Sequence, residues 1–204
     1  MTSILTGDII NSRSISSEKW LPLLKTAFND LGKTPKTWEI YRGDSFQVEV
    51  ETIENALLFA IKLKTILKKI KNLDVRIAIG IGTKNDNYNN ITEGSGEAFI
   101  NSGKAFDTLL KKQNLVIISP WNDIDKVFNT ALALALLTID NWTVNSADFV
   151  LKYLKKPDTT QKIIAKELNI SESSASERRK RAGLDEVIQL EKLYRELIIE
   201  KISN

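Results

Sequence analysis

Two aspartates, Asp8 and Asp44, are the side chains of this 204-residue sequence whose type and position best suit chemistry. Asp8 directly follows SILTG (3–7), which reads as a short buried strand. Asp44 lies in the predicted β-hairpin IYRGDSFQVEV (40–50), where Gly43 and Asp44 would form a two-residue turn. Two carboxylates that converge at one sheet end repel each other unless a cation lies between them. Such a pair could hold the metal ions of phosphoryl transfer. The alternative is that both are turn residues, because aspartate bonds nearby backbone.

The chain contains no histidine and no cysteine. This removes the commonest general base and transition-metal ligand, and it excludes disulfides, thiolate catalysis and cysteine-based zinc sites. A metal ion here would need oxygen ligands, so we expect Mg²⁺ or Mn²⁺. The first residues lack the basic start of a signal peptide, and the longest apolar run, ALALALL at 131–137, is too short to cross a membrane. We therefore expect a cytoplasmic protein without membrane contact.

Several residues could bind phosphate. The segment GSGEAF (94–99) precedes a predicted helix, and backbone N–H groups at a helix N-terminus can hold phosphate. Gly96 and Lys104 are the candidates there, and the alternative is a simple loop in which Glu97 caps the first turn. Arg13 and Arg42, close to the two aspartates in the sequence, could neutralise phosphate or pair with the acids themselves.

A second constellation lies in TTQKIIAKELNISESSASERRKRAG (159–183). Ala165, Asn169 and Ala175 have helix-turn-helix spacing, with Ser171 as the cap of the second helix, whose early side chains would reach DNA bases and whose basic end would contact phosphates. The base-facing candidates are Ser173, Ser174, Ser176 and Glu177, and the phosphate-contacting candidates are Arg178, Arg179, Lys180 and Arg181. A recognition helix usually has an apolar residue near position 178 or 179, and this sequence has arginine at both. The alternative is a solvated charged face on a helix pair used for dimerisation.

The elements that must position these residues follow from the apolar periodicity. We expect strands at 3–7, in the hairpin, at 74–82 and at 114–119, and helices over 16–32, 51–72 and 96–112. This order predicts an α+β fold: a ferredoxin-like, palm- or cyclase-like antiparallel sheet with helices and an added edge strand over 1–120. An all-α domain over 121–204 would carry the helix-turn-helix at 159–183.

Two faces in this region leave their roles open. In DVRIAIGIG (74–82), Ala78, Gly80 and Gly82 share one face, where they either let a helix pack closely or leave room for a ligand. The helix over 51–72 carries lysines that we expect on a solvated face, namely Lys62, Lys64, Lys68, Lys69 and Lys71.

The ordered segments GDIINSR, YRGDSFQ, DVRIAIGIG and GSGEAFINSGKAFD resemble the SatD family of bacterial proteins, in which a C-terminal helix-turn-helix segment also occurs. More distantly they resemble the palm-like core of class III and GGDEF nucleotidyl cyclases. That resemblance implies two metal ions held on Asp8 and Asp44, with backbone contacts at Ile9 and Ile10. It also assigns Asn101 to transition-state stabilisation.

This sequence departs from the cyclase pattern in two places. The arginine expected four residues after Asn101 is replaced by Ala105, and the nearest cation is Lys104. The GGDEF glycine pair and following acid are replaced by Arg42-Gly43 and Ser45. The resemblance therefore implies metal-nucleotide binding more directly than turnover.

The net charge of +3 lies in the last quarter of the chain, since residues 151–204 carry 12 Lys+Arg and 9 Asp+Glu. This surplus suggests an anionic partner. We expect a DNA-binding transcriptional regulator with a metal-nucleotide ligand at Asp8 and Asp44, acting as a homodimer. The alternative is a divalent-metal-dependent nucleotidyl cyclase or nucleotidyltransferase, and a third is a protein-interaction module with a degenerate palm-like core. The amphipathic segment 184–202 could pack on the core or pair with a second chain.

Overall fold

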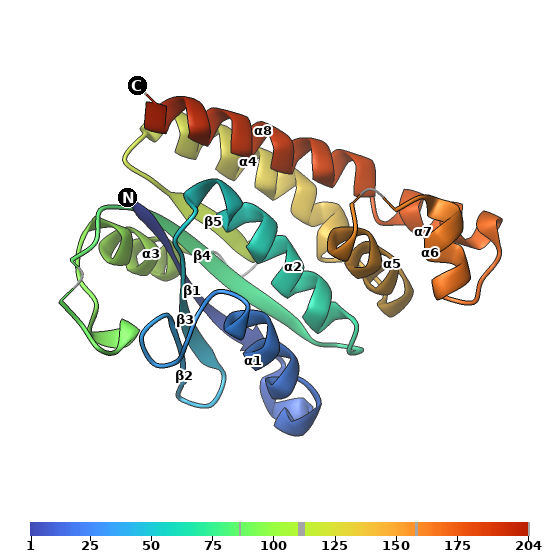
Figure 1. Cartoon of the computed structure of the whole chain (residues 1–204), viewed down its shortest axis with the longest axis horizontal. Coiled ribbons are helices and arrows are strands. Elements are labelled where there is room, and N and C mark those ends of the chain that lie inside the picture. Colours follow the sequence, from blue (N-terminus) through green and yellow to red (C-terminus); the bar gives the residue numbers. More distant parts are fainter. Residues whose placement is uncertain (86, 110–112, 158, 204) are drawn as a thin grey trace.

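A five-stranded sheet lies at the centre of the molecule in the computed structural model, which describes residues 1–85, 87–109, 113–157 and 159–203 (Figure 1). The strands are β1 (Thr2–Ile10), β2 (Trp38–Tyr41), β3 (Ser45–Val50), β4 (Asp74–Gly82) and β5 (Leu115–Ile118), and their order is β2-β3-β1-β4-β5. The pairs β2–β3, β3–β1 and β1–β4 are antiparallel, and the pair β4–β5 is parallel. The fold is thus α+β as expected, but the sheet is mixed, because a helix returns the chain across the sheet before β5.

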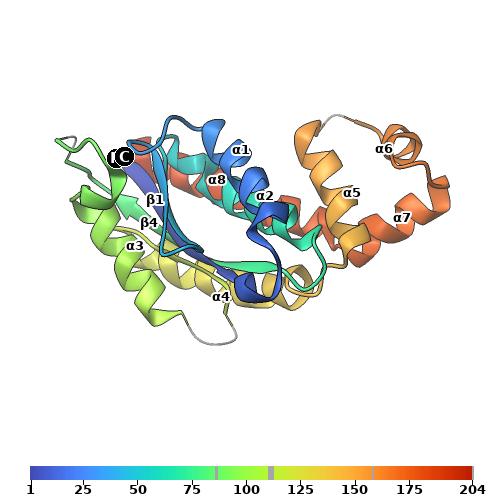
Figure 2. The ribbon, with the colours of Figure 1, turned by 90° about the horizontal axis from the view of Figure 1, so that it is seen from below.

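Helices cover both faces of this sheet (Figure 2). Helices α1 (Leu21–Asn29) and α2 (Ala56–Lys68) lie on one face, and α3 (Glu97–Thr108) lies on the other against β4 and β1. Shorter 3₁₀ turns occupy Ser12–Ser14, Ser17–Lys19, Ile53–Asn55 and Ile91–Glu93. The helix expected over 16–32 is therefore a 3₁₀ turn followed by α1, with Pro22 in the first turn of α1. The predicted helix end at 110–112 lies outside the described residues.

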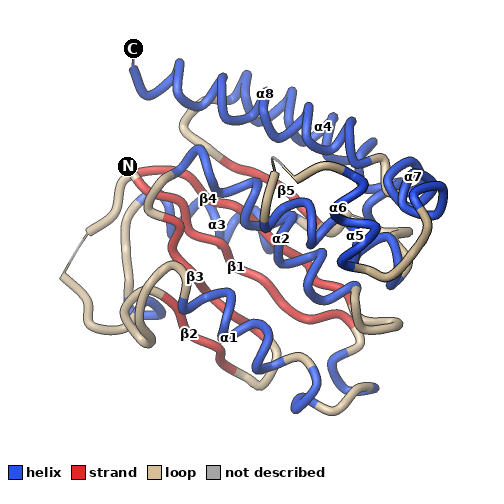
Figure 3. The backbone as a smooth tube through the Cα atoms, turned by 45° about the vertical axis from the view of Figure 1, so that its right-hand side comes forward, coloured by secondary structure: helices blue, strands red, loops and turns tan. Residues whose placement is uncertain are grey.

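The remaining helices follow β5 in the order α4 (Asn122–Ile139), α5 (Val144–Lys155), α6 (Gln161–Glu167), α7 (Glu172–Arg181) and α8 (Leu184–Ser203). Helices α4 and α8 lie side by side along the β5 edge (Figure 3). Helix α8 packs on the core, where the Tyr194 hydroxyl donates to the Ile53 carbonyl at 2.9 Å. Helices α6 and α7 stand at one end, away from the sheet (Figure 2). No helix in the described part of the chain is long and apolar enough to span a membrane.

The alternation read from the sequence decides which face of each strand is buried. Val75, Ile77, Ile79 and Ile81 of β4 are fully buried toward α1 and α2. The same apolar cluster continues without a break into α4, α5, α7 and α8. The domain boundary expected at residue 120 stays a prediction. Buried side chains from both sides of it belong to this one cluster.

The small residues on the other face of β4 admit a helix. A Cβ placed on Gly80 would collide with the backbone of Ala98 and Ser102, and one on Gly82 would collide with Glu97 and Ala98, all in α3. Close packing of α3 therefore fills the space at these two glycines, and the ligand alternative does not apply to them.

The expectation of a solvated lysine face on α2 is wrong for two of the five lysines. Lys64 is fully buried and Lys68 is 9% exposed. Lys64 lies 2.9 Å from Asp74 and 2.8 Å from Asp140, and Lys68 lies 2.9 Å from the other oxygen of Asp74. The two lysines are buried because acids from β4 and from the end of α4 neutralise them inside the protein.

Candidate functional site

Asp8 and Asp44 lie at the same end of the sheet, as the sequence suggested. Asp8 is paired in register with Ser45, the residue after Asp44, and the Ile9 amide donates to the Asp44 carbonyl at 3.1 Å. Both aspartates line one open pocket of about 470 Å³, which residues 9–14, Arg76 and Asn114 complete. We call this cavity the Asp8–Asp44 pocket.

Arg76 is the cation that pairs with Asp8 in this pocket, and the sequence reasoning did not select it. It lies opposite Asp8 in the β1–β4 ladder, and its Nε donates to Asp8 Oδ1 at 2.9 Å while a second nitrogen pairs with Oδ2. The hydrogen bond to Asp8 raises the pKa of the Arg76 guanidinium, and the nearby charge of Asp44 acts in the same direction. The repulsion expected between the two carboxylates is therefore relieved by a side chain of the protein.

Asp44 has a structural partner that explains an acid at this turn. Its carboxylate accepts a hydrogen bond from the Ser12 hydroxyl at 2.5 Å, which ties the hairpin tip to the 3₁₀ turn after β1. The turn itself has three residues between the paired Tyr41 and Ser45, with Arg42 at φ 53° and Gly43 at φ 91°. The two-residue turn read from the sequence is wrong, because Arg42 also adopts the left-handed conformation.

The two carboxylates do not form a ready metal site. Arg76 occupies both oxygens of Asp8, and Ser12 occupies one oxygen of Asp44. Among the described residues, no group of three or more acidic, histidine or cysteine side chains is placed so that it could hold a metal ion. A hard divalent cation seeks about six oxygen ligands and would have to displace Arg76 here. The donor set therefore does not fit Mg²⁺ or Mn²⁺ as it stands, and the metal stays an untested prediction.

The candidate phosphate-binding residues do not converge. Arg13 is exposed and lines the Asp8–Asp44 pocket, whereas Arg42 lines a separate hollow of about 410 Å³ with Tyr41 and Gln47. Asn101 is buried and donates to the Ile81 carbonyl at 2.8 Å, so its amide holds α3 against β4. Lys104 is exposed on α3.

Gly96 lies at the opposite end of the sheet from the two aspartates. It contacts the backbone at Thr83 and Lys84, just beyond Gly82, and Gly82 pairs with Thr2. Thr2 and Asp8 are six residues apart on one strand, which is about 20 Å. One ligand phosphate therefore cannot contact both GSGEAF and the Asp8–Asp44 pocket.

Helices α6 and α7 form where the sequence predicted them, joined by four residues, 168–171. Asn169 adopts φ 53°, and Ser171 caps α7 by accepting a hydrogen bond from the Ser174 amide at 3.1 Å. Ala165 and Ala175 are buried between the helices, with exposed fractions of 2% and 0%. Ser173, Ser174, Ser176 and Glu177 are exposed on α7.

The four basic residues at the end of α7 fall into two groups, those that form an ion pair and those that do not. Arg179 forms an ion pair with Asp185, and its guanidinium carbon lies 5.7 Å from the ring centre of Tyr153 in α5. Arg181 pairs with Glu177 at 3.0 Å. Arg178 and Lys180 form no ion pair within the described ranges. Arg179 is therefore engaged within the fold, whereas Arg178 and Lys180 have no acidic partner among the described residues.

Comparison with known proteins gives one match. The family model described as SatD family (SatD) matches residues 3–198, nearly the whole chain. No curated protein and no solved structure matches the chain.

Proposed function

We propose that this chain, which belongs to the SatD family, is a DNA-binding regulator that reads duplex DNA with α6 and α7 as a helix-turn-helix. In the proposal, α7 enters the major groove and the sheet region senses a small ligand. The observation that carries the proposal is the exposed outer face of α7 on a pair of short helices that stands clear of the sheet.

The packing of α6 against α7 supports this assignment. A DNA-reading helix needs a fixed angle to its partner helix so that its early side chains reach base edges. Ala165 and Ala175 are small enough to let the two helices approach, and the left-handed Asn169 turns the chain between them. The exposed serines Ser173, Ser174 and Ser176 then form the surface that would face the bases.

The charges support phosphate contact by a subset of the basic run. Arg178 and Lys180 are the α7 cations without an ion pair in the described part of the chain, and exposed Lys162 and Lys166 lie on the adjoining α6. Lys162 approaches Glu172 only at 3.7 Å, with both side chains largely exposed. Such cations supply affinity without sequence preference and lose it as salt rises.

The strand order supports a ferredoxin-like, palm-like core for the sensing region. Strands β2, β3, β1 and β4 are neighbours in that order and alternate in direction, as a ferredoxin-like sheet requires. The Asp8–Asp44 pocket is the proposed nucleotide site, with Arg76 and Arg13 as its positive charges. The homodimer expected from the sequence remains part of the proposal.

The alternatives have less support. A nucleotidyl cyclase needs metal ions where Arg76 now pairs with Asp8, and it lacks the arginine that Ala105 replaces. A protein-interaction module would also use the exposed α7 surface, but it gives Arg178 and Lys180 no phosphates to contact. The regulator is therefore the function that we carry forward.

Binding of a labelled duplex, followed by fluorescence anisotropy over a salt series, tests the proposal. We expect Arg178→Gln with Lys180→Gln to reduce the slope of log affinity against log salt by about 2, because each lost phosphate contact contributes about 0.9. The matched control is Lys126→Gln with Lys192→Gln, which removes the same charge from exposed positions on α4 and α8. Equal slopes for the two double variants, or no binding by the natural chain, would overturn the proposal.

A further inference from the structure

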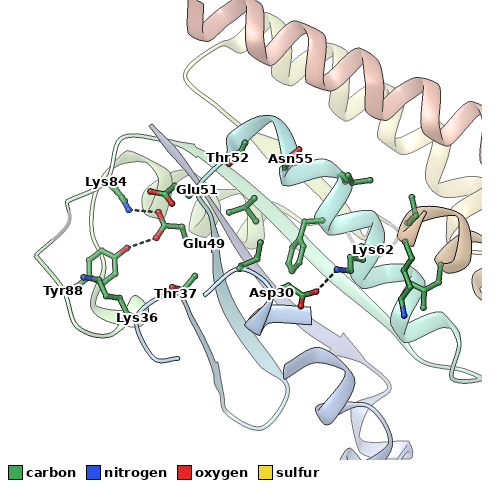
Figure 4. Close-up of a pocket in the computed structure, with 17 residues that line it drawn as sticks. Asp30, Lys36, Thr37, Glu49, Glu51, Thr52, Asn55, Lys62, Lys84 and Tyr88 are labelled. Carbon is green, nitrogen blue, oxygen red and sulfur yellow. Dashed lines mark hydrogen bonds and ion pairs between the residues drawn. The ribbon is translucent and has the colours of Figure 1, made fainter. Parts of the chain in front are cut away.

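A second groove lies away from the Asp8–Asp44 pocket. It has a volume of about 760 Å³ and is bounded by the loop after α1, the end of β3, the start of α2 and the C-terminal half of α5 (Figure 4). Glu49 and Val50 lie at the end of β3 remote from Asp44, so the two cavities are at opposite ends of the strand. We call this cavity the α2–α5 groove.

The groove combines an apolar floor with a charged rim. Val50, Phe59 and Leu151 line it with exposed fractions of 2%, 6% and 8%, and Leu58 and Leu154 add further apolar surface. Four lysines and three acids stand around this floor, namely Lys36, Lys62, Lys84, Lys155, Asp30, Glu49 and Glu51. Apolar surface beside placed charged groups suits a small organic ligand that carries a charge.

Two of the acids are already neutralised. Glu49 is held by Lys84 at 2.8 Å and accepts hydrogen bonds from Thr2 at 2.6 Å and from Tyr88 at 3.4 Å. Asp30 pairs with Lys62 at 3.0 Å across the gap between α1 and α2 (Figure 4). Lys36 and Lys155 form no ion pair with any described residue. Of the three acids of the rim, only Glu51 also forms no ion pair with a described residue. The rim therefore carries an uncompensated positive charge.

Helix α5 connects this groove to the helices that would read DNA. Leu151, Leu154 and Lys155 lie at spacings of three and four residues, so they share the face of α5 that lines the groove. The intervening residues contact the other side: Lys152 pairs with Glu167 of α6 at 3.0 Å, and Tyr153 lies under Arg179 of α7. A ligand that fixes the position of α5 therefore acts on both α6 and α7.

We propose that the α2–α5 groove is an effector site for a small organic anion, an apolar or aromatic body bearing one acidic group, whose binding changes the affinity of α6 and α7 for DNA. The body lies on Val50, Phe59 and Leu151, and the acidic group lies toward Lys36 or Lys155. The effector role rests on the proposed function, whereas binding in the groove does not.

Binding is tested with two fluorescent probes of similar shape, 8-anilino-1-naphthalenesulfonate and its uncharged counterpart N-phenyl-1-naphthylamine. We expect the full chain to bind the sulfonate more tightly than the neutral probe. Lys36→Gln with Lys155→Gln should weaken the sulfonate about fivefold and leave the neutral probe unchanged, as expected for an exposed ion pair. Leu154→Glu should weaken both probes, and the Lys126→Gln, Lys192→Gln control should change neither.

Equal affinity for the two probes, or sulfonate binding that the Lys36 and Lys155 variants leave intact, would overturn the site. The effector role is read separately, as duplex affinity with and without saturating sulfonate. A change that Lys36→Gln with Lys155→Gln abolishes supports it, and an unchanged affinity overturns it. If the natural chain binds no duplex, the proposed function fails and the effector role with it, while the probe titration still decides the groove.

Discussion

Arg76 lies directly opposite Asp8 in the β1–β4 ladder, and its guanidinium donates to both oxygens of that carboxylate. Because the strand register fixes this pairing, the cation is as much a part of the sheet end as the two aspartates. The chemistry open to Asp8 and Asp44 therefore depends on whether a ligand can displace Arg76. Five predictions test this relationship and three other features of the fold.

We expect Mg²⁺ and Mn²⁺ to leave the Tm of the natural chain unchanged, because Arg76 already neutralises Asp8. Arg76→Gln should cost about 1 kcal/mol of stability, and Mn²⁺ should then raise the Tm of this variant, since two carboxylates are left without a cation. Arg13→Gln is the control, because it removes an equal charge from the same pocket without breaking an ion pair among the described residues. A Tm rise in the natural chain that Asp44→Asn abolishes would favour the metal site instead.

For the same reason, we expect no cyclic or linked product when the natural chain is incubated with the four ribonucleoside triphosphates and Mg²⁺ or Mn²⁺. Product analysis by chromatography measures this directly, with the Asp44→Asn variant as the reference. A product made by the natural chain and lost in Asp44→Asn would make this protein an enzyme and displace the regulator as its proposed function.

Arg179 and Arg178 are adjacent, yet we expect their substitutions to act differently on DNA binding. Arg179→Gln loses the Asp185 ion pair and the contact with Tyr153, so it should destabilise the fold by about 1 kcal/mol. For the Arg179→Gln variant, the slope of log DNA affinity against log salt should equal that of the natural chain. Arg178→Gln should reduce that slope by about 1. Urea unfolding and anisotropy titrations separate the two effects. A reduced slope in Arg179→Gln would show that Arg179 contacts phosphate.

The buried Lys64 holds two acids from distant elements together, Asp74 of β4 and Asp140 at the end of α4. Lys64→Met leaves Asp140 without an ion pair among the described residues and leaves Asp74 with Lys68 alone, and we expect a loss of about 3 kcal/mol in the free energy of unfolding. The same substitution in an Asp140→Asn background should cost less, because one of the two charges is gone. Urea unfolding of the four chains of this cycle measures the coupling, and strictly additive losses would contradict the buried pairing.

Gly80 of β4 and Gly103 of α3 give a matched pair of glycine-to-alanine changes, one inside the β4–α3 contact and one outside it. Gly80→Ala drives a methyl group into the backbone of α3, and we expect a loss of about 2 kcal/mol. Gly103 lies in α3 with no atom within 4 Å of an added Cβ, so Gly103→Ala should stabilise the chain by about 1 kcal/mol. Thermal unfolding of both variants tests the packing, and a neutral Gly80→Ala would point to free space above β4.

The local elements could be predicted well because they depend on residues close in the sequence. Alternation placed Val75, Ile77, Ile79 and Ile81 on one buried face, and the structure confirms all four. The cap at Ser171 also follows from neighbouring residues, since its partner amide is three positions away. The predicted approach of Asp8 to Asp44 succeeded because strand order alone brings these two ends together.

The sequence by itself determined the strands, the helices, the α6–α7 turn and the end of the sheet at which the two aspartates meet. The tertiary structure decided which charged side chains are free to contact a ligand. Asp8 is paired with Arg76, 68 residues away, and the buried Lys64 is neutralised by Asp140. Periodicity cannot supply such pairs, because they depend on strand register and on which helix covers which face. Those choices minimise the free energy of the whole chain, in which an uncompensated buried charge costs more than any local preference supplies.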